Sequence, residues 1–300
     1  MWLLITILAY FFLAVVSLFD RYFLVGPMPS PKVYTFYVGT IGLLFCLFFI
    51  PFGTSLPAIN IVFLGLLAGL IRIIAILFLT ISITKSEISR TVPVVGALQP
   101  IFSFLLFFLF FPQSRILNIF QLVAFILLVF GSVLISIKRF DKEFFNFKTL
   151  KYPITASFLY SLTFFLTKNL FLETNFLSGM FLILLGSGLT ALAFLVFPKS
   201  RKIIFNQKIS GKISGLFMLG QIIGGTAIIL QYYAVFLAKA GQIPLINALE
   251  GTRYVFLLFF VFLFGRWRPQ ILKEETSKEV ILQKIIAILF IGGGLTLLAL

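Results

Sequence analysis

The sequence predicts an all-α integral membrane protein with ten transmembrane helices, arranged as two inverted repeats of five helices each. Three observations support this prediction. The 300-residue chain is 61% hydrophobic and only 11% charged, with a mean hydropathy of +1.15, a balance that water-soluble domains do not have. Ten apolar runs are each long enough to cross a bilayer. Landmarks of the first five runs recur in the last five at a nearly constant offset.

The ten apolar runs define the predicted helices, because a spanning helix needs about 17 to 25 residues. Helices are favoured over strands, since barrel strands would alternate polar and apolar residues and these runs do not. The first run begins at Trp2 and is too long and aromatic for a cleaved signal sequence, so we expect it to be retained. In order, the runs lie at 2–19, 34–51, 59–83, 91–111, 117–137, 152–170, 176–197, 213–237, 242–264 and 282–300.

The residue inventory argues against several classes of protein. The chain has no histidine and one cysteine, Cys46, which excludes disulfides, His-Cys metal sites and Ser-His-Asp triads. It also lacks a nucleotide-binding glycine loop. We therefore predict no enzyme, no metal and no cofactor. The net charge of +15 would suggest nucleic acid in a soluble protein, but these basic residues lie between the runs and predict topology instead.

Matching segments indicate the internal repeat. The segment PVVGALQP at 93–100 aligns with PLINALEG at 244–251, 151 residues later. An offset of 147 residues relates three further landmarks to their counterparts: Gly39 to Gly186, Pro51 to Pro198, and FDRYFL at 19–24 to LTKNLF at 166–171. Gly131 pairs with Gly294 once a longer loop before the last run is allowed for. We predict one repeat over residues 1–140, a basic connector over 141–151 and the second repeat over 152–300.

Loop charges predict the orientation. Because five is odd, the second repeat must cross the membrane in the opposite sense from the first. The odd-numbered loops hold 19 Lys and Arg residues and the even-numbered loops hold 3, and cytoplasmic loops are the ones enriched in these residues. We therefore expect a multi-pass protein of the cell membrane, with odd loops cytoplasmic and both termini extracytoplasmic.

The end of the third run and the fourth run read LFLTISITKSEISRTVPVVGALQPIFSFLLFFLFF. With ten runs in two copies, this chain resembles the drug/metabolite transporter superfamily, EamA type. Pro93 and Pro100 fit the proline of that family's fourth helix, and Ser86 and Ser89 fit the polar turn before it. The resemblance implies a ten-helix transporter fold. The chain differs from the family in two respects. Gln113 lies near the position where the family commonly has a glutamate. The family also usually keeps both termini in the cytoplasm, against the loop charges of this chain, so the two orientations stay open.

A charged residue in the middle of the third run indicates a site. Arg72 has 11 residues on each side between Ile61 and Ile83, about 16 Å from either end of the helix. Facing lipid there would cost about 2.5 to 3.5 kcal/mol. Arg72 is therefore expected to face a wet cavity or a structural ion-pair partner.

Glu250 and Arg253 are two opposite charges deep inside the ninth run. Their spacing of three places them on one face of a helix, where they can pair. A neutralised pair costs desolvation free energy that leucines would avoid, so a substrate site is favoured. The alternative is a structural pair that fixes the ninth helix against the third or the fourth. Gln99 lies at the position equivalent to Glu250. Neutral residues that could add hydrogen bonds to the site, or link helices instead, are Gln221, Gln231, Tyr232, Asn247 and Tyr254.

Other polar and small residues have more ordinary interpretations. The patterns Gly65-x-x-x-Gly69 and Gly220-x-x-x-Gly224 favour close helix packing over room beside a cavity. Asp20, Arg21 and Lys168 are expected to be interfacial anchors.

These observations predict a secondary transporter that works by alternating access. If Arg72, Arg253 and Glu250 are ionised the site carries +1, which favours a small substrate with an anionic group, such as an amino acid or carboxylate. Coupled protons and membrane lipid are the other expected partners, and a homodimer is compatible with the sequence. The alternatives are a flippase for a lipid-linked or polyisoprenyl phosphate, a membrane-embedded enzyme, and a non-transporting scaffold or receptor.

The charge bias generates a prediction about orientation. A reporter fused after Leu300 should report an extracytoplasmic location, because the loop before the last run carries five of the 19 odd-loop basic residues. The measurement is the activity of paired reporters that work on only one side of the membrane. A fusion active only in the cytoplasm would favour the family's usual orientation instead.

Overall fold

A computed structural model describes residues 1–50, 54, 57–85, 88–111, 117–136, 147–207, 211–264 and 278–299. These residues form helices and short connections, with no strand among them, which confirms the predicted all-helical class for this part of the chain. Ser86, Gln113 and residues 141–146 of the predicted connector lie outside it.

The helices of the first half follow the first five predicted runs. They are α1 (Trp2–Val25), α2 (Pro31–Phe49), α3 (Ile59–Lys85), α4 (Ile88–Phe110) and α5 (Ile119–Ser136). The helix α1 continues six residues beyond the predicted end at residue 19, and this extension carries Asp20 and Arg21. Pro31 occupies the first turn of α2, where a missing N–H and a fixed φ suit a helix start.

The second half is less regular. It comprises α6 (Phe147–Glu173), α7 (Phe176–Ala193), η4 (Phe194–Val196), α8 (Pro198–Asn206), α9 (Gly211–Leu237), η5 (Ala240–Gln242), α10 (Ile243–Ala248), α11 (Glu250–Phe264) and α12 (Lys278–Ala299). The side chain of Asn175 caps α7 by accepting a hydrogen bond from the N–H of Ser178 at 2.9 Å. The ninth predicted run is broken, because α10 ends just before Glu250 and α11 begins there.

Seven segments of the described chain are long and apolar enough to cross a membrane, which indicates a multi-pass membrane protein. They are Trp2–Val25, Pro31–Phe49, Ile59–Lys85, Phe176–Val196, Gly211–Leu237, Ala240–Phe260 and Leu282–Ala299. The other three predicted runs also fall on helices, but with a weaker signal. The apolar parts of α4 and α5, Val94–Phe110 and Ile119–Ile135, are short. The helix α6 is more polar, since Ser157, Ser161, Thr163, Thr167 and Lys168 are all buried within the bundle.

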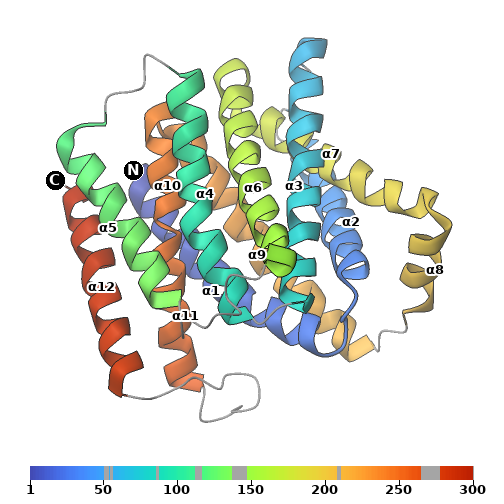
Figure 1. Ribbon diagram of the computed structural model, residues 1–300. Helices are drawn as coiled ribbons and strands as arrows, with labels where there is room; N and C mark the ends of the chain where they lie inside the picture. Colours follow the sequence, from blue (N-terminus) through green and yellow to red (C-terminus); the bar gives the residue numbers. More distant parts are fainter. Residues whose placement is uncertain are drawn as a thin grey trace.

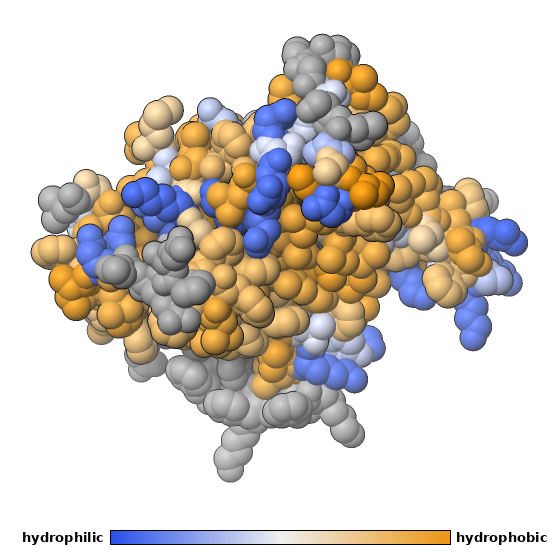
Figure 2. Space-filling model, turned by 90° about the horizontal axis from the view of Figure 1, so that it is seen from above, coloured by the Kyte–Doolittle hydropathy of each residue, from blue (hydrophilic) through white to orange (hydrophobic). Residues whose placement is uncertain are grey.

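The outer surface supports this assignment. Large hydrophobic side chains are exposed on several helices, among them Leu44, Phe48, Phe63, Phe110, Phe130 and Leu289, each at least 59% exposed. Figure 2 shows hydrophobic residues over most of the visible surface, with hydrophilic residues gathered in separate patches. A monomeric soluble protein rarely exposes apolar area on this scale, so the surface is suited to lipid.

The helix α6 lies at the centre of the bundle, packed against α3 and α4, while α1 packs against α9 and α2 against α7. In Figure 1, α5 and α12 lie side by side at the left edge, α8 is at the right edge, and both chain ends lie toward the upper left. Buried polar residues therefore collect in the middle, where α6 is covered by its neighbours.

Glycines bring α3 and α7 into backbone contact. A Cβ on Gly69 would lie 2.5 Å from the backbone nitrogen of Ser187, and one on Gly186 would lie 2.7 Å from the Cα of Leu66. A Cβ on Gly65 would likewise lie 2.5 Å from the Cβ of Leu182. The packing role predicted for the Gly65 and Gly69 pattern is confirmed, because these contacts leave no space for a side chain.

A reciprocal crossing joins α5 and α12. A Cβ on Gly131 would lie 2.7 Å from Ile291 Cγ1 and 3.1 Å from the carbonyl oxygen of Ala287. A Cβ on Gly294 would lie 2.7 Å from Leu128 Cγ and 3.1 Å from the carbonyl oxygen of Ala124. Each glycine thus fits against the residues three and seven positions before the other. The crossing has the symmetry of a local twofold axis.

Lys168 is not the interfacial anchor that the sequence predicts. It is 4% exposed, and its Nζ donates to the carbonyl oxygens of Val235, Phe236 and Ala238 at 3.3, 3.3 and 2.6 Å. These carbonyls lie at the end of α9, where a helix has unsatisfied acceptors and a partial negative charge. Lys168 therefore fixes α6 to the end of α9.

The α3–α7 contact generates a stability prediction. Gly69→Ala should lower the stability of the protein by about 1 to 3 kcal/mol, because the new methyl group would push the two backbones apart. Gly215→Ala is the matched control, since a Cβ there has nothing within 4 Å and alanine favours the helix. The measurement is the melting midpoint of each variant in detergent. Equal midpoints for Gly69→Ala and wild type would show that this contact is not tight.

Candidate functional site

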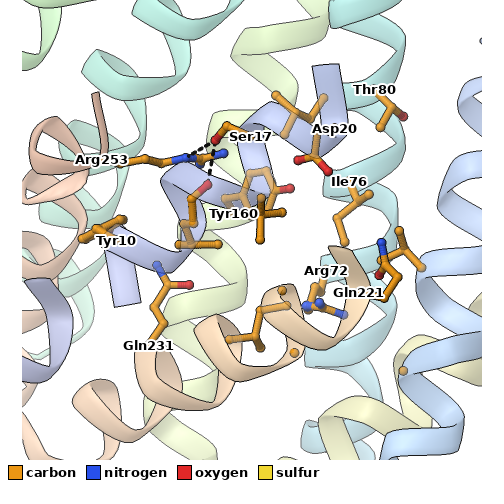
Figure 3. Close-up of a pocket in the computed structure, with 18 of the residues that line it drawn as sticks. Tyr10, Ser17, Asp20, Arg72, Ile76, Thr80, Tyr160, Gln221, Gln231 and Arg253 are labelled. Carbon is orange, nitrogen blue, oxygen red and sulfur yellow. Dashed lines mark hydrogen bonds between the residues drawn. The ribbon is translucent and has the colours of Figure 1, made fainter. Parts of the chain in front are cut away.

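A cavity of about 290 Å³ lies within the bundle. Residues from α1, α2, α3, α4, α6, α7, α9 and α11 line it, so both halves of the chain contribute. The lining is mainly apolar, and its charged members are Asp20, Arg21, Arg72, Glu250 and Arg253. A mostly apolar cavity with a few converging polar groups is the usual form of a small-molecule site. Figure 3 shows Arg72, Asp20, Tyr160 and Arg253 around this space.

Arg72 lies on α3 and is 6% exposed. Its Nη1 donates to Ser187 Oγ of α7 at 3.3 Å, and Ser187 Oγ in turn donates to the carbonyl oxygen of Gly69 at 3.2 Å. No carboxylate of the described residues lies within ion-pair distance of Arg72. The guanidinium therefore faces the cavity with two neutral hydroxyls, those of Ser187 and Tyr232, as its hydrogen-bond partners among the described residues. A buried cation in this position is suited to an anionic ligand.

Glu250 and Arg253 form the pair that the spacing predicts. Arg253 Nη1 lies 3.2 Å from Glu250 Oε1, and Arg253 Nε donates to Ser17 Oγ of α1 at 2.9 Å. Tyr254 lies next to the same carboxylate oxygen, at 3.5 Å. The other oxygen, Glu250 Oε2, is buried without a hydrogen-bond partner among the described residues. The pair is neutral as a whole, and one carboxylate oxygen is left for a proton or a ligand.

The break between α10 and α11 positions Glu250. Leu249 adopts a turn conformation, and Thr252 N–H donates to the Leu249 carbonyl at 2.9 Å, three residues back. Glu250 thus begins α11, where the partial positive charge of a helix start stabilises a carboxylate. Tyr10 of α1 fastens this region by donating to the carbonyl oxygen of Ile246 at 2.9 Å.

Asp20 is a site residue that the sequence analysis assigned to the membrane interface. It lies in the extension of α1 and lines the cavity together with Arg72. The hydroxyl of Tyr34 on α2 donates to Asp20 Oδ1. Asp20 forms no ion pair with a described residue. The signal that could have found it is the aspartate itself, since only two occur in the chain.

The predicted neutral residues divide into two groups. Those that line the cavity are Gln99, Gln221, Tyr232 and Tyr254, together with Gln231. Asn247 does not reach the cavity lining. It lies fully buried between α10 and α4, where it accepts from Gln99 Nε2 at 3.2 Å and donates to Ser103 Oγ at 2.9 Å. Asn247 therefore links helices, which was the alternative role for residues of this kind.

Tyrosines supply further hydroxyl groups that the sequence analysis missed. Tyr10, Tyr34 and Tyr160 all line the cavity. Tyr160 of α6 lies within electrostatic range of Asp20, Arg72, Glu250 and Arg253, which makes it a central residue of the site. The described residues contain no cluster of three or more metal-ligating side chains.

Comparisons with known proteins give a fold but no family. No family model matches the chain, and no curated protein matches its sequence. A solved structure described only as "Crystal structure of protein" superposes with a TM-score of 0.68 at 14% sequence identity. The match covers 99% of this chain and 94% of that chain. At this identity the likeness concerns the fold alone.

The pairing of Glu250 and Arg253 generates a stability prediction. Arg253→Leu should lower stability by up to about 3 kcal/mol, because it leaves a buried carboxylate without its cation. The double variant Glu250→Leu, Arg253→Leu should recover most of that loss, since paired charges can be replaced together. The measurement is a comparison of melting midpoints. A double variant as unstable as the single one would mean that Arg253 stabilises the fold through Ser17 and not through Glu250.

Proposed function

We propose that the chain is a secondary transporter of the drug/metabolite transporter superfamily, EamA type. It has ten transmembrane helices in two inverted five-helix repeats, and it moves a small metabolite with an anionic group by alternating access. The observation that carries this proposal is Arg72, a buried cation that faces a central cavity with only neutral hydroxyls, those of Ser187 and Tyr232, as its partners among the described residues. A structural ion pair, the alternative role for Arg72, would require a carboxylate that the described residues do not supply.

The energetics support a ligand at this position. A charged residue at the bilayer centre costs about 2.5 to 3.5 kcal/mol on insertion scales, and a neutral hydroxyl recovers only part of that. Of the cavity's charged residues, three are basic and two are acidic, so the site carries a net formal charge of +1. An anionic group is therefore favoured over a lipophilic cation.

Helix packing supports the two-repeat arrangement. Gly131 and Gly294 are counterparts in the predicted repeat, and each fits against the same relative positions of the other's helix. Contacts between α1 and α9 have their counterpart in contacts between α6 and α3, as expected for two copies related by a twofold axis. All ten predicted runs fall on helices.

A difference between the two halves supports alternating access. On one side, α3 and α7 meet backbone to backbone at Gly69 and Gly186. In the proposed repeat, α9 is the counterpart of α3, and α2 is the counterpart of α7. The ring of Phe45 on α2 lies between these two helices beside the cavity, since a Cβ on Gly225 of α9 would meet that ring at 3.5 Å. One half is closed where its counterpart leaves space. Exchange of these two arrangements would open the site to the other side.

Substrate binding is tested through Arg72. Arg72→Leu should weaken binding of an anionic ligand by about tenfold to a hundredfold, because a charge-assisted hydrogen bond contributes roughly 1.5 to 3 kcal/mol. The measurement is thermal stabilisation of purified protein by a panel of carboxylates, amino acids and phosphate esters, since a ligand of the folded state raises the midpoint. Polyisoprenyl phosphate belongs in the panel, and stabilisation by it alone would favour a flippase.

The matched control for this test is Arg201→Leu, which removes a positive charge from an exposed position on α8. Its ligand affinity should equal that of wild type. Unchanged affinity in Arg72→Leu would remove the anion site and leave Arg72 as part of the α3–α7 packing.

Glu250 is the group proposed to couple transport to protons, because one of its oxygens is buried without a partner while the residue lines the cavity. Glu250→Gln should abolish uptake driven by a pH gradient, since an amide does not exchange protons, while substrate exchange between the two sides should survive. Uptake into proteoliposomes with and without a gradient measures both. Glu173→Gln, at an exposed carboxylate near the end of α6, is the control. Full gradient-driven uptake by Glu250→Gln would assign Glu250 a structural role.

A further inference from the structure

Three charged residues of the cavity stand apart from the Glu250–Arg253 pair, namely Asp20, Arg21 and Arg72. Arg72 on α3 has neutral hydroxyls as its hydrogen-bond partners among the described residues, and Asp20 on α1 accepts from the hydroxyl of Tyr34. Neither forms an ion pair with a described residue. Both line the same cavity. Arg72 and Asp20 therefore offer a ligand one cation and one anion that no described residue neutralises by an ion pair.

We infer that Asp20, positioned by Tyr34, is a binding site for the cationic group of the substrate. Arg72 binds the anionic group of the same molecule. This inference rests on the proposed function and narrows its substrate class to a zwitterion, with an amino acid as the simplest case. Tyr34 is a positioning residue here, because its hydroxyl occupies Oδ1 and leaves Oδ2 of Asp20 for the ligand.

Glu250 is a weaker candidate for the cationic group. Its Oε1 is paired with Arg253 at 3.2 Å, and this cation stays beside it whether or not a ligand is bound. A positive ligand group at Glu250 would meet the repulsion of Arg253. Asp20 has no cation within ion-pair distance among the described residues, although Arg253 lies within electrostatic range of it. Arg21 lines the cavity as well, but no ion pair joins it to Asp20.

A zwitterion satisfies this cavity better than a simple anion. An anion bound at Arg72 would leave Asp20 without a counter-charge and would be repelled by it, since both residues line the same cavity. A zwitterion supplies both counter-charges while bringing no net charge into a low-dielectric space. The surrounding apolar lining, which includes Val16, Phe45 and Ile76, is suited to a hydrocarbon portion of the same ligand.

The test compares matched ligands on the purified full-length protein. The probes are the common amino acids and a series of ω-amino acids from glycine to aminohexanoate. Each amino acid is compared with two analogues of the same carbon skeleton, one that has only the carboxylate and one that has only the amine. The ω-series varies the spacing between the two charges. We expect at least one amino acid to bind about tenfold to a hundredfold more tightly than its carboxylate, as read from thermal stabilisation. The corresponding amine should bind still more weakly, because it cannot use Arg72.

The variant Asp20→Asn isolates the proposed subsite, since it keeps an oxygen to accept from Tyr34 and removes the charge. It should lose the preference for the amino acid, and its affinity for the carboxylate should be at least that of wild type, because the repulsion from Asp20 is removed. Glu173→Gln makes the same chemical change outside the cavity and should keep the preference. Tyr34→Phe keeps the charge of Asp20 but removes the hydrogen bond that positions its carboxylate, so it should reduce the preference by several-fold. It serves as the second variant if Asp20→Asn does not fold.

Two results overturn the inference and spare the proposed function. One is a wild-type protein that binds carboxylates as tightly as the amino acids, and the other is an Asp20→Asn variant that keeps the preference. A different result overturns the proposed function itself: a wild-type protein that no carboxylate, phosphate ester or amino acid stabilises. The two failures are thus distinguishable in one set of melting curves.

Discussion

A buried positive charge in the middle of an apolar bundle is the constraint on which this structure depends. Arg72 cannot reach water along its own helix, and the hydroxyl of Ser187 neutralises none of its charge. The protein must therefore keep a polar space beside α3, and the cavity is that space. The shape of the cavity depends on how closely the surrounding helices pack against one another. Glycines on α3, α7 and α9 set several of these helix–helix distances.

The glycines of α3 and those of α9 act differently. Gly65 and Gly69 bring α7 close enough for its Ser187 to reach the guanidinium, so tight packing also positions the partner of Arg72. On α9, Gly224 borders the cavity, and a Cβ added there would lie 3.6 Å from Cγ2 of Val16, an ordinary contact distance. The same kind of small-residue pattern therefore closes one helix pair and leaves room at another. The sequence does not distinguish these outcomes, because they depend on which helix comes to face each glycine.

Much of the fold could be predicted because the bilayer imposes a simple rule. Backbone groups in lipid must be satisfied within the helix, so a long apolar run predicts a helix directly, and each of the ten runs falls on helix where the chain is described. Arg72, Glu250 and Arg253 were found for the same reason, since a charge is conspicuous inside such a run. Asp20 was missed because the run was ended at residue 19, while α1 continues to Val25 and carries this carboxylate into the cavity.

Other features could not be predicted because they depend on neighbouring helices. Asn247 and Gln99 are both amides inside apolar runs, but one is buried between helices and the other also borders the cavity. Lys168 looked like an interfacial residue until the end of α9 supplied three carbonyl oxygens for it. The break at Leu249 has no proline or glycine at that residue, and the tie from Tyr10 to Ile246 becomes visible only in three dimensions.

The charges of the site are distributed unequally between the proposed repeats, and this inequality bears on how a ligand can bind. Glu250 corresponds to the neutral Gln99, and Asp20 corresponds to the neutral Thr167, so each acid occurs in one copy only. The two separate charges, Asp20 and Arg72, come from the first half, while the second half supplies a pair that is already neutral. A fold with two related halves would by itself offer a ligand two equivalent orientations. In the proposed transporter, these charges would give a ligand with distinct ends one favoured orientation, and rearrangement of the helices would change its exposure without turning it over.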